Sequence, residues 1–269
     1  MELLKYIILG IMQGITEPLP ISSSGHIYIF KTMFNTAIFD DLTLEIFLNF
    51  ASFAAILIIF KKEVWDLIKG FFNYIKTKGT ENKKEYTYAW MVVIGTIPVG
   101  ILGLLTKDFL EELLSKNVFY VGIGFLITAI ALISVMNAKG KKKDEDIKWK
   151  EAVIIGIFQA ISIVPGISRS GMTLVGSLLC GLDKKTALKY TFMLYFPVSI
   201  ATMILGIAGI NSVGINISLI IEYIAGMIAA GIFTYISYNW LNNIVEKNKL
   251  WKFSLYLLAV AMFTLMFFI

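Results

Sequence analysis

The chain has 269 residues, of which 57% are hydrophobic and only 16% are charged, and its formal net charge at pH 7 is +5. About one-quarter of the residues of a soluble domain are charged, so this composition excludes an ordinary soluble globular protein. It also excludes a disordered chain, because so apolar a sequence does not stay solvated. The single cysteine excludes an internal disulfide framework. The composition therefore predicts a polytopic membrane protein.

Six apolar segments are long enough to cross a membrane as single helices. A helix of about 17–25 apolar residues spans the hydrocarbon core of a bilayer. The segments of this length are 44–60, 88–105, 118–136, 190–210, 217–241 and 253–269. They predict six transmembrane helices in an all-α fold.

Two further apolar segments, 1–30 and 152–182, are interrupted at their middle. The first contains Pro18 and Pro20, and the second contains Pro165 followed by glycine. Proline opens the hydrogen-bond ladder of a helix, and opened backbone at membrane depth survives only where protein or a water-filled cavity covers it. We therefore predict that both segments are re-entrant helical hairpins.

The distribution of lysine between the apolar segments predicts the orientation in the membrane. Cytoplasmic loops carry an excess of lysine and arginine. Nineteen lysines lie in four of the breaks, which are 61–87, 137–151, 183–189 and 242–252. The other three breaks, 31–43, 106–117 and 211–216, together contain only three lysines. The lysine-rich breaks are expected to be cytoplasmic and the others to face outward. Segment 152–182 then enters and leaves on the cytoplasmic side, as a hairpin does.

The two interrupted segments are related by an internal repeat. An offset of 146 residues places 10–26 over 156–172, with eight of 17 positions identical, including an Ile-Ser-x-Ser-Gly core. One hairpin is expected to open from outside and the other from the cytoplasm, so we predict two inverted-topology repeats in one membrane domain. Each repeat is a hairpin plus three transmembrane helices, over 1–137 and 152–269, with 138–151 as a cytoplasmic linker. Such folds place their site near the bilayer midplane.

The only arginine, Arg169, and the only histidine, His26, lie in the two aligned motifs. An ionised side chain at membrane depth costs at least about 2.5 kcal/mol. Arginine suits bidentate binding of phosphate oxygens, so a buried Arg169 indicates an oxyanion partner. The alternative is an ion pair between Arg169 and Glu17 that holds the hairpins together, and such a pair could also open to admit a diphosphate.

Serines precede the resumed helix of each hairpin. Free backbone N–H groups at a helix start bind anions, and serine hydroxyls extend such a cradle. The alternative role of these serines is simple N-capping. They are Ser22, Ser23 and Ser24 in the first hairpin and Ser168 and Ser170 in the second.

Three more polar residues of the first hairpin are candidates for the chemistry. His26 titrates near the working pH and is a candidate general acid or nucleophile. Glu17 could hold a divalent ion or act as a base toward water. Gln13 lies one helical turn before Glu17, so both side chains are expected on the same face.

Two motifs closely resemble the undecaprenyl-diphosphatase family of the BacA type, the bacitracin-resistance proteins. They are Gln-Gly-Ile-Thr-Glu-Pro-Leu-Pro-Ile-Ser-Ser-Ser-Gly-His at 13–26 and Pro-Gly-Ile-Ser-Arg-Ser-Gly-Met-Thr at 165–173. Fainter similarity at 95–98 and 192–197 extends the resemblance over nearly the whole chain. The resemblance implies an integral membrane enzyme with two inverted repeats. Such enzymes remove the terminal phosphate of a C55 polyprenyl diphosphate, depend on Mg²⁺ or Ca²⁺, and open their active site to the outer face.

The resemblance also implies roles for individual residues. Glu17, Ser23 and His26 correspond to functional residues of the first family motif, and Ser168, Arg169 and Thr173 to those of the second. Many relatives have glutamate where this chain has Gln13, which makes Gln13 a weaker metal ligand beside Glu17. The attacking group is left open between water, Ser23 and His26.

Hydrolysis of a lipid phosphoanhydride in the plasma membrane is the predicted function, with recycling of the glycan carrier lipid and bacitracin resistance as its consequences. The rival is a polyprenyl-phosphate flippase or transporter, which the inverted repeats suggest; a structural scaffold would leave the buried arginine and histidine unexplained.

The lysine runs are expected to be anchors at anionic lipid heads, not a nucleic-acid site. The partners are then the lipid substrate and the bilayer, and the sequence leaves open whether the chain forms a homodimer.

Overall fold

The computed structural model describes residues 2–34, 42–116, 118–208 and 217–268. Within these ranges the chain is all-helical, as predicted, and forms no strand beyond one isolated bridge between Lys142 and Leu182. The helices are α1 (Glu2–Thr16), α2 (Ser23–Phe34), α3 (Leu42–Ile59), α4 (Lys61–Thr77), α5 (Lys83–Lys116), α6 (Phe119–Ser134), α7 (Trp149–Ile161), α8 (Arg169–Leu179), α9 (Lys184–Ala208), α10 (Ile217–Glu246) and α11 (Trp251–Phe267). Of the predicted outward-facing breaks, 35–41, 117 and 211–216 lie outside the described residues.

By length and composition, three helices of the described chain can cross a membrane, within α5, α9 and α10. A fourth span is possible if α3 and α4 are taken together, although they meet at an angle of 77°. The prediction of six full-length spans is thus supported only in part. Helices α6 and α11 cover most of the predicted segments 118–136 and 253–269, but at 16 and 17 residues they lie at the lower limit of the length that spans a bilayer.

Both interrupted segments form two helices separated by a break, as their prolines predict. The first break, 17–22, contains Pro18 and Pro20 and ends at Ser22, whose φ is +67°. The second break, 162–168, contains Pro165 and Gly166, and the φ of Gly166 is +88°. Positive φ is strained for a serine, so contacts from the rest of the protein must hold Ser22 in place.

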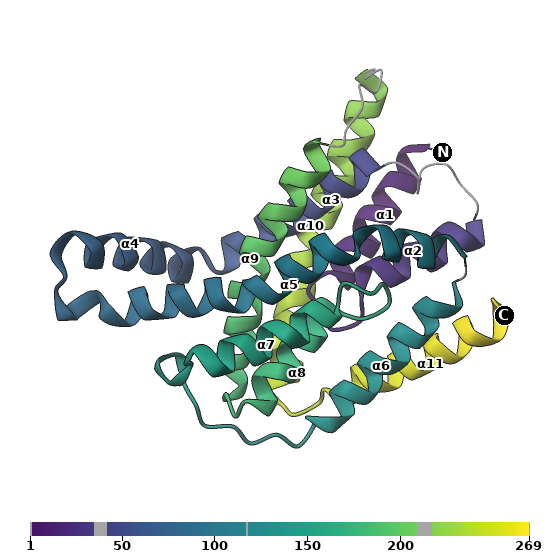
Figure 1. The fold of residues 1–269 in the computed structure, drawn as a ribbon. Helices are drawn as coiled ribbons and strands as arrows, with labels where there is room; N and C mark the ends of the chain where they lie inside the picture. The colour runs from purple at the N-terminus through teal and green to yellow at the C-terminus, as the bar shows by residue number, and fades with distance from the viewer. Residues whose placement is uncertain (1, 35–41, 117, 209–216, 269) are drawn as a thin grey trace.

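The helices before the two breaks pack through equivalent glycines. Helix α1 lies against α10 and α7 lies against α5 (Figure 1). A Cβ added at Gly10 would lie 2.1 Å from the carbonyl oxygen of Gly226, and one added at Gly156 would lie 2.4 Å from that of Gly95. Gly10 and Gly156 are the aligned positions of the internal repeat. Small residues let membrane helices approach this closely, so both aligned glycines lie at close helix contacts.

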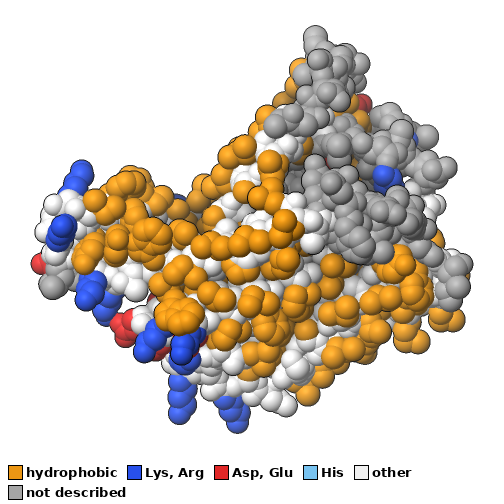
Figure 2. Space-filling view, in the orientation of Figure 1, with side chains coloured by type: hydrophobic (Ala, Val, Ile, Leu, Met, Phe, Trp, Pro, Cys, Tyr) orange, Lys and Arg blue, Asp and Glu red, His pale blue; other side chains and the backbone are white. Residues whose placement is uncertain are grey.

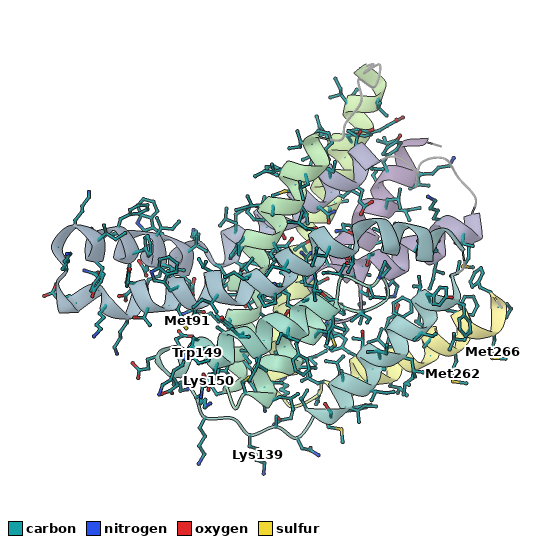
Figure 3. The ribbon with its side chains drawn as sticks, viewed as in Figure 1. Met91, Lys139, Trp149, Lys150, Met262 and Met266 are labelled. Atoms are coloured by element: carbon teal, nitrogen blue, oxygen red, sulfur yellow. The ribbon has the colours of Figure 1, made fainter. Side chains whose placement is uncertain are left out.

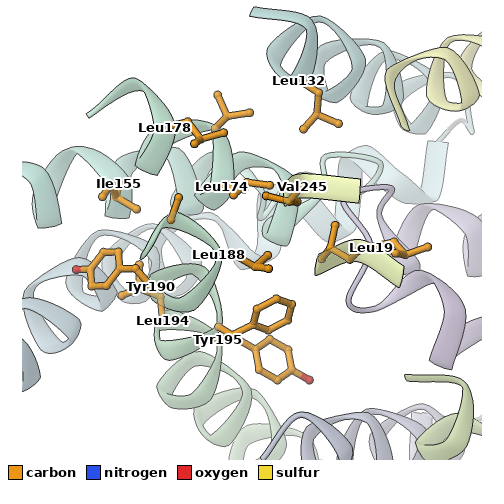
Figure 4. Close-up of a cluster of buried hydrophobic side chains, with 14 of the residues drawn as sticks. Leu19, Leu132, Ile155, Leu174, Leu178, Leu188, Tyr190, Leu194, Tyr195 and Val245 are labelled. Atoms are coloured by element: carbon orange, nitrogen blue, oxygen red, sulfur yellow. The ribbon is translucent and has the colours of Figure 1, made fainter. Parts of the chain in front are cut away.

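The buried core lies where α8, α9 and the first break meet. Figure 4 shows Leu174 and Leu178 of α8 with Leu188, Tyr190 and Leu194 of α9 in one buried cluster, and Leu19 of the first break at its right-hand side. Leu19 is 2% exposed and Leu174 is fully buried. The core thus fixes the first break against the helix that follows the second.

The surface is that of a multi-pass membrane protein. Hydrophobic side chains cover most of the described part of the face in Figure 2, and lysines gather at its lower left, around the tip of α4–α5 and the loops below it. Lys139 and Lys150, beside Trp149, lie at this end in Figure 3, whereas Met262 and Met266 lie far from it on α11. This separation of lysine from apolar surface is the pattern of a helix bundle in a lipid bilayer.

Candidate functional site

The two breaks contact each other through polar side chains. The hydroxyl of Ser170, at the start of α8, donates a hydrogen bond of 2.9 Å to the carbonyl oxygen of Leu19 in the first break. Arg169 Nη2 lies 3.0 Å from Glu17 Oε1. The predicted meeting of the two motifs is therefore found in the structure, and so is the ion pair expected as an alternative role for Arg169.

The serines at the two helix starts make matching hydrogen bonds. Ser22 Oγ accepts a bond from the backbone N–H of Gly25 at 3.3 Å, and Ser168 Oγ accepts one from Gly171 at 3.1 Å. Each capping serine also lies close to the serine two residues later: Ser22 to Ser24 at 3.3 Å and Ser168 to Ser170 at 3.2 Å. The capping role left open for these serines is thus confirmed for Ser22 and Ser168.

Glu17 connects most of the polar residues of the site. Its Oε1 accepts from Arg169, while its Oε2 accepts from Ser23 Oγ at 2.5 Å and from Gln13 Nε2 at 3.1 Å. The Glu17 side chain is only 5% exposed, whereas that of Arg169 is 29% exposed. Since the guanidinium is more open than the carboxylate, Arg169 can meet a further anion while Glu17 stays covered.

Arg169 is also held by an aromatic ring. Its Cζ lies 5.1 Å from the centroid of the Tyr195 ring on α9, within the range of a cation–π interaction. Tyr195 is not among the residues predicted from the sequence, although it lies in the faint motif at 192–197. The ring fixes the guanidinium without consuming any of its hydrogen-bond donors.

Ser23 has the geometry of an activated hydroxyl. Its O–H points at the buried carboxylate of Glu17, and both residues line the same cavity. A nucleophilic hydroxyl needs a base within about 2.6–3.2 Å, and the short Ser23–Glu17 bond meets this requirement. Of the two candidate side-chain nucleophiles, Ser23 is the one that faces the cavity.

The structure does not bring His26 to the cavity. Its Nδ1 lies 2.7 Å from the carbonyl oxygen of Ser22, and its Nε2 lies 2.7 Å from the hydroxyl of Tyr256 on α11. Because a carbonyl only accepts, Nδ1 carries the proton, and in the neutral ring Nε2 accepts from Tyr256. The ring also stacks on Tyr256 and meets the edge of Phe125. His26 therefore faces α6 and α11, with both nitrogens engaged.

A cavity of about 580 Å³ connects the polar residues to an apolar gap between helices. All the predicted site residues except His26 line this cavity. They are Gln13, Glu17, Ser22, Ser23, Ser24, Ser168, Arg169, Ser170 and Thr173. Thr173 donates to the carbonyl oxygen of Arg169 at 2.8 Å, which keeps its hydroxyl beside the arginine. The cavity lining thus includes one arginine, several hydroxyls and two carboxylates, those of Glu17 and Glu45.

Two polar residues of α3 also line the cavity. Asn49 Oδ1 accepts from Gln13 Nε2 at 2.7 Å, and Glu45 lines the cavity one helical turn earlier. Neither Asn49 nor Glu45 is among the site residues predicted from the sequence. A signal was present, because two polar residues four apart share one face of an otherwise apolar helix.

The oxygen atoms near Glu17 suit a hard divalent cation. Gln13 Oε1 is buried and has no hydrogen-bond partner within the described part of the chain, so it is available as a ligand. Carboxylate and amide oxygens are the ligands that Mg²⁺ and Ca²⁺ prefer. No group of three or more His, Cys, Asp or Glu that could hold a metal occurs among the described residues. A cation here would therefore depend on Glu17 and Gln13, completed by substrate oxygens or water.

The fold and the cavity define a multi-pass helical membrane protein with a buried arginine–carboxylate–serine site between two broken helices. The family described as "Bacitracin resistance protein BacA" matches residues 6–263, and the chain belongs to this family. It is 41% identical over 265 residues to "Undecaprenyl-diphosphatase 2" of Bacillus thuringiensis, covering 98% of this chain and 97% of that protein.

Two more relatives have the same name and cover the same extent of the chain. "Undecaprenyl-diphosphatase" of Oceanobacillus iheyensis is 41% identical over 98% of this chain and 96% of its own length. "Undecaprenyl-diphosphatase 1" of Bacillus licheniformis is 37% identical, over 98% of both chains. The resemblance inferred from the two motifs is thus confirmed.

Proposed function

We propose that this protein is an undecaprenyl-diphosphate phosphatase, which hydrolyses the lipid diphosphate to the lipid monophosphate and phosphate. The observation that carries the proposal is one cavity in which Arg169, Ser23 and Glu17 occupy a polar end and apolar side chains line the rest. A lipid diphosphate has the same division into a charged head and an apolar tail. The names of the relatives support the same reaction.

In the proposed reaction, Arg169 releases part of its contact with Glu17 and binds oxygens of the terminal phosphate. Ser168, Ser170 and Thr173, together with Ser22 and Ser24, place hydroxyls around the diphosphate. The charge that develops on the phosphoryl oxygens in the transition state is then met by preorganised donors, which is how most phosphoryl transfer is catalysed.

Ser23 is the proposed nucleophile. Its oxygen forms a bond to the terminal phosphorus while Glu17 accepts its proton, and the bond from that phosphorus to the bridging oxygen breaks. The lipid monophosphate leaves with the electron pair. Glu17 then loses its proton to solvent. Water attacks the phosphoserine while Glu17 accepts a proton from it, the bond from phosphorus to Ser23 Oγ breaks, and Glu17 returns the proton to that oxygen as phosphate is released.

A divalent cation, Mg²⁺ or Ca²⁺, is proposed to bind with the substrate. Glu17 would hold it together with Gln13, whose buried Oε1 has no hydrogen-bond partner among the residues that the structure describes. When bound, such an ion neutralises part of the diphosphate charge. Glutamine is a neutral ligand, so we expect weaker affinity for the metal than a second carboxylate would give.

We further propose that the two halves are inverted repeats and that the cavity opens to the outer face of the plasma membrane. The 146-residue internal repeat, the equivalent packing of Gly10 and Gly156, and the lysine bias of the loops support this topology. The reaction would return the carrier lipid for cell-wall glycan synthesis on that face, and would give the bacitracin resistance for which the family is named.

The deciding experiment measures phosphate release from a polyprenyl diphosphate by the purified protein in detergent, with and without a chelator. We expect release that requires no gradient, that the chelator suppresses, and that falls by about 100- to 1,000-fold in Arg169→Ala. A protein that releases no phosphate but moves labelled lipid across vesicles would instead be a transporter, which no feature of the site favours.

A further inference from the structure

Glu45 is the single ionisable residue in the sequence of α3, a helix that is otherwise mostly apolar. Its side chain lines the cavity one helical turn before Asn49. Within the described part of the chain it forms no hydrogen bond and no ion pair. An ionisable residue in a membrane segment is costly to keep and marks a functional site by default. A cavity-lining carboxylate without a protein partner therefore indicates a cationic ligand.

The amide of Gln13 has a fixed orientation beside this face of α3. Its Nε2 donates to Glu17 Oε2 at 3.1 Å and to Asn49 Oδ1 at 2.7 Å, and an ionised carboxylate only accepts, so the amide nitrogen must lie on this side. Gln13 is 1% exposed, and its Oε1 accepts no hydrogen bond from the residues that the structure describes. Leaving a buried acceptor unsatisfied costs about 1–3 kcal/mol, so this oxygen is also kept for a ligand that donates or is positively charged.

The charge of the lining calls for a cation once a diphosphate is bound. Among the described residues of the lining Arg169 is the only basic one, whereas Glu17 and Glu45 are both acidic, so the formal charge of the lining is −1. Glu17 and Glu45 are close enough for their charges to repel each other, and Lys31 at the end of α2 offsets this only in part. A diphosphate adds further negative charge in a medium of low dielectric, where like charges repel strongly.

We propose that Glu45 and Asn49 on α3, together with Gln13, hold a divalent cation, so that a lipid diphosphate binds to this protein as its cation complex and not as the free anion. The inference rests on the proposed function and adds the two residues of α3 to Glu17 and Gln13. Carboxylate and amide oxygens are ligands of Mg²⁺ and Ca²⁺, and Mg²⁺ keeps several waters through which such residues also bind it. Arg169 and the serines are then left to the phosphate oxygens.

The test removes the charge of Glu45 without changing the size of its side chain, in Glu45→Gln. Glu222→Gln is the matched control, because Glu222 is also a carboxylate in an apolar helix, α10, but does not line the cavity. Glu45→Asp retains the charge and is expected to keep most of the wild-type binding. Thermal unfolding in detergent verifies that all three variants are folded.

Binding is measured with farnesyl methylenediphosphonate, a diphosphate mimic whose bridging CH₂ group resists hydrolysis, once with Mg²⁺ and once with EDTA. With Mg²⁺ we expect Glu45→Gln to bind the probe about tenfold more weakly than the wild type, because the cation loses one of its partners. With EDTA we expect Glu45→Gln to bind the probe at least as tightly as the wild type, because a repelling carboxylate is gone. Unchanged binding with Mg²⁺, or an equal loss in both conditions, would overturn the proposal.

The same variants separate this inference from the proposed reaction. In the phosphate-release assay, the Mg²⁺ concentration that gives half of the maximal rate should rise by about tenfold in Glu45→Gln and stay unchanged in Glu222→Gln. If the wild type hydrolyses no polyprenyl diphosphate but the probe responds as expected to Mg²⁺ and EDTA, the proposed reaction fails and the cation site stands. If the wild type hydrolyses the diphosphate and Glu45→Gln responds to Mg²⁺ as Glu222→Gln does, the cation site fails and the reaction stands.

Discussion

Glu17 and Arg169 form an ion pair of 3.0 Å that joins the two broken helices across the cavity. The pair brings together residues 152 positions apart, one from each copy of the internal repeat. The carboxylate is almost fully covered, so its charge is compensated mainly by this arginine and by the hydroxyl of Ser23. One contact thus holds the fold together at rest and presents the cation that a diphosphate would bind.

Removal of only one partner should therefore damage both stability and activity. In Arg169→Gln the buried Glu17 loses its counter-charge, and breaking a buried pair costs about 3–5 kcal/mol, toward the lower end here because Arg169 is 29% exposed. The double variant Glu17→Gln with Arg169→Gln removes both charges, and we expect it to recover most of the lost stability but no activity. Thermal unfolding and phosphate release test this. A double variant no more stable than Arg169→Gln would show that the pair does not hold the breaks together.

Ser23→Ala should abolish turnover if Ser23 is the nucleophile. We expect kcat to fall by about 1,000-fold or more, because the base would then have no hydroxyl to activate. Ser24→Ala is the control, since Ser24 lines the cavity but bonds to Ser22 instead of Glu17; we expect less than about a tenfold loss. Mass spectrometry after rapid quenching with substrate should find phosphate on Ser23. Substantial activity in Ser23→Ala would indicate direct attack by water.

The sequence predicted the helix breaks and the meeting of the two motifs, and gave the ion pair as an alternative role of Arg169, because proline, serine and the single arginine give local or repeated signals. It did not predict Tyr195, Asn49 or Tyr256. These residues belong to α9, α3 and α11, and their contacts with the site depend on how helices distant in the chain pack. The number of full-length spans is supported only in part, because hydropathy shows where an apolar segment lies but not how far its helix crosses the membrane, and three described helices, or four with the bent α3–α4 pair, meet the length and composition of a span.

Acid should loosen the loop between α6 and α7. A hydrogen bond from Lys142, at 2.8 Å, holds the pKa of Glu151 below its usual value, although burial partly opposes this. The folded state then binds the Glu151 proton less readily than the unfolded chain, so the stabilisation is present above the ordinary pKa of about 4.5 and is lost as the pH falls through the lowered value. Both side chains are partly exposed, which limits the effect to about 1 kcal/mol.

The measurement is Tm in detergent between pH 7 and pH 3.5 for wild type and Lys142→Met. We expect the Tm of the wild type to fall more steeply below about pH 4.5, so that the two curves converge in acid. Lys84→Met is the control, because Lys84 and Glu145 form a pair on the open surface, with side chains 76% and 57% exposed, and its curve should follow that of the wild type. Parallel curves for wild type and Lys142→Met would exclude a contribution from the Lys142–Glu151 pair.

His26 is expected to position the first break instead of taking part in the reaction. Its Nδ1–H donates to the carbonyl oxygen of Ser22, the residue held at a φ of +67°, and Tyr256 holds the other side of the ring. Loss of the imidazole in His26→Ala should release Ser22 and misplace Ser23, with a fall in kcat of about 10- to 100-fold. Tyr256→Phe keeps the stacked ring but loses one hydrogen bond, so we expect only about a threefold loss.

The pH profile distinguishes positioning from catalysis by His26. If His26 only holds Ser22, then His26→Asn, which can still donate to the Ser22 carbonyl, should recover part of the activity lost in His26→Ala. The residual activity should also keep the pH dependence of the wild type, since the ionising groups of the reaction are unchanged. Loss of one limb of the pH–rate profile in His26→Asn, or phosphate trapped on His26 under conditions that preserve phosphohistidine, would instead assign the histidine to the chemistry. Because its Nε2 lies 2.7 Å from the Tyr256 hydroxyl and outside the cavity lining, we expect neither result.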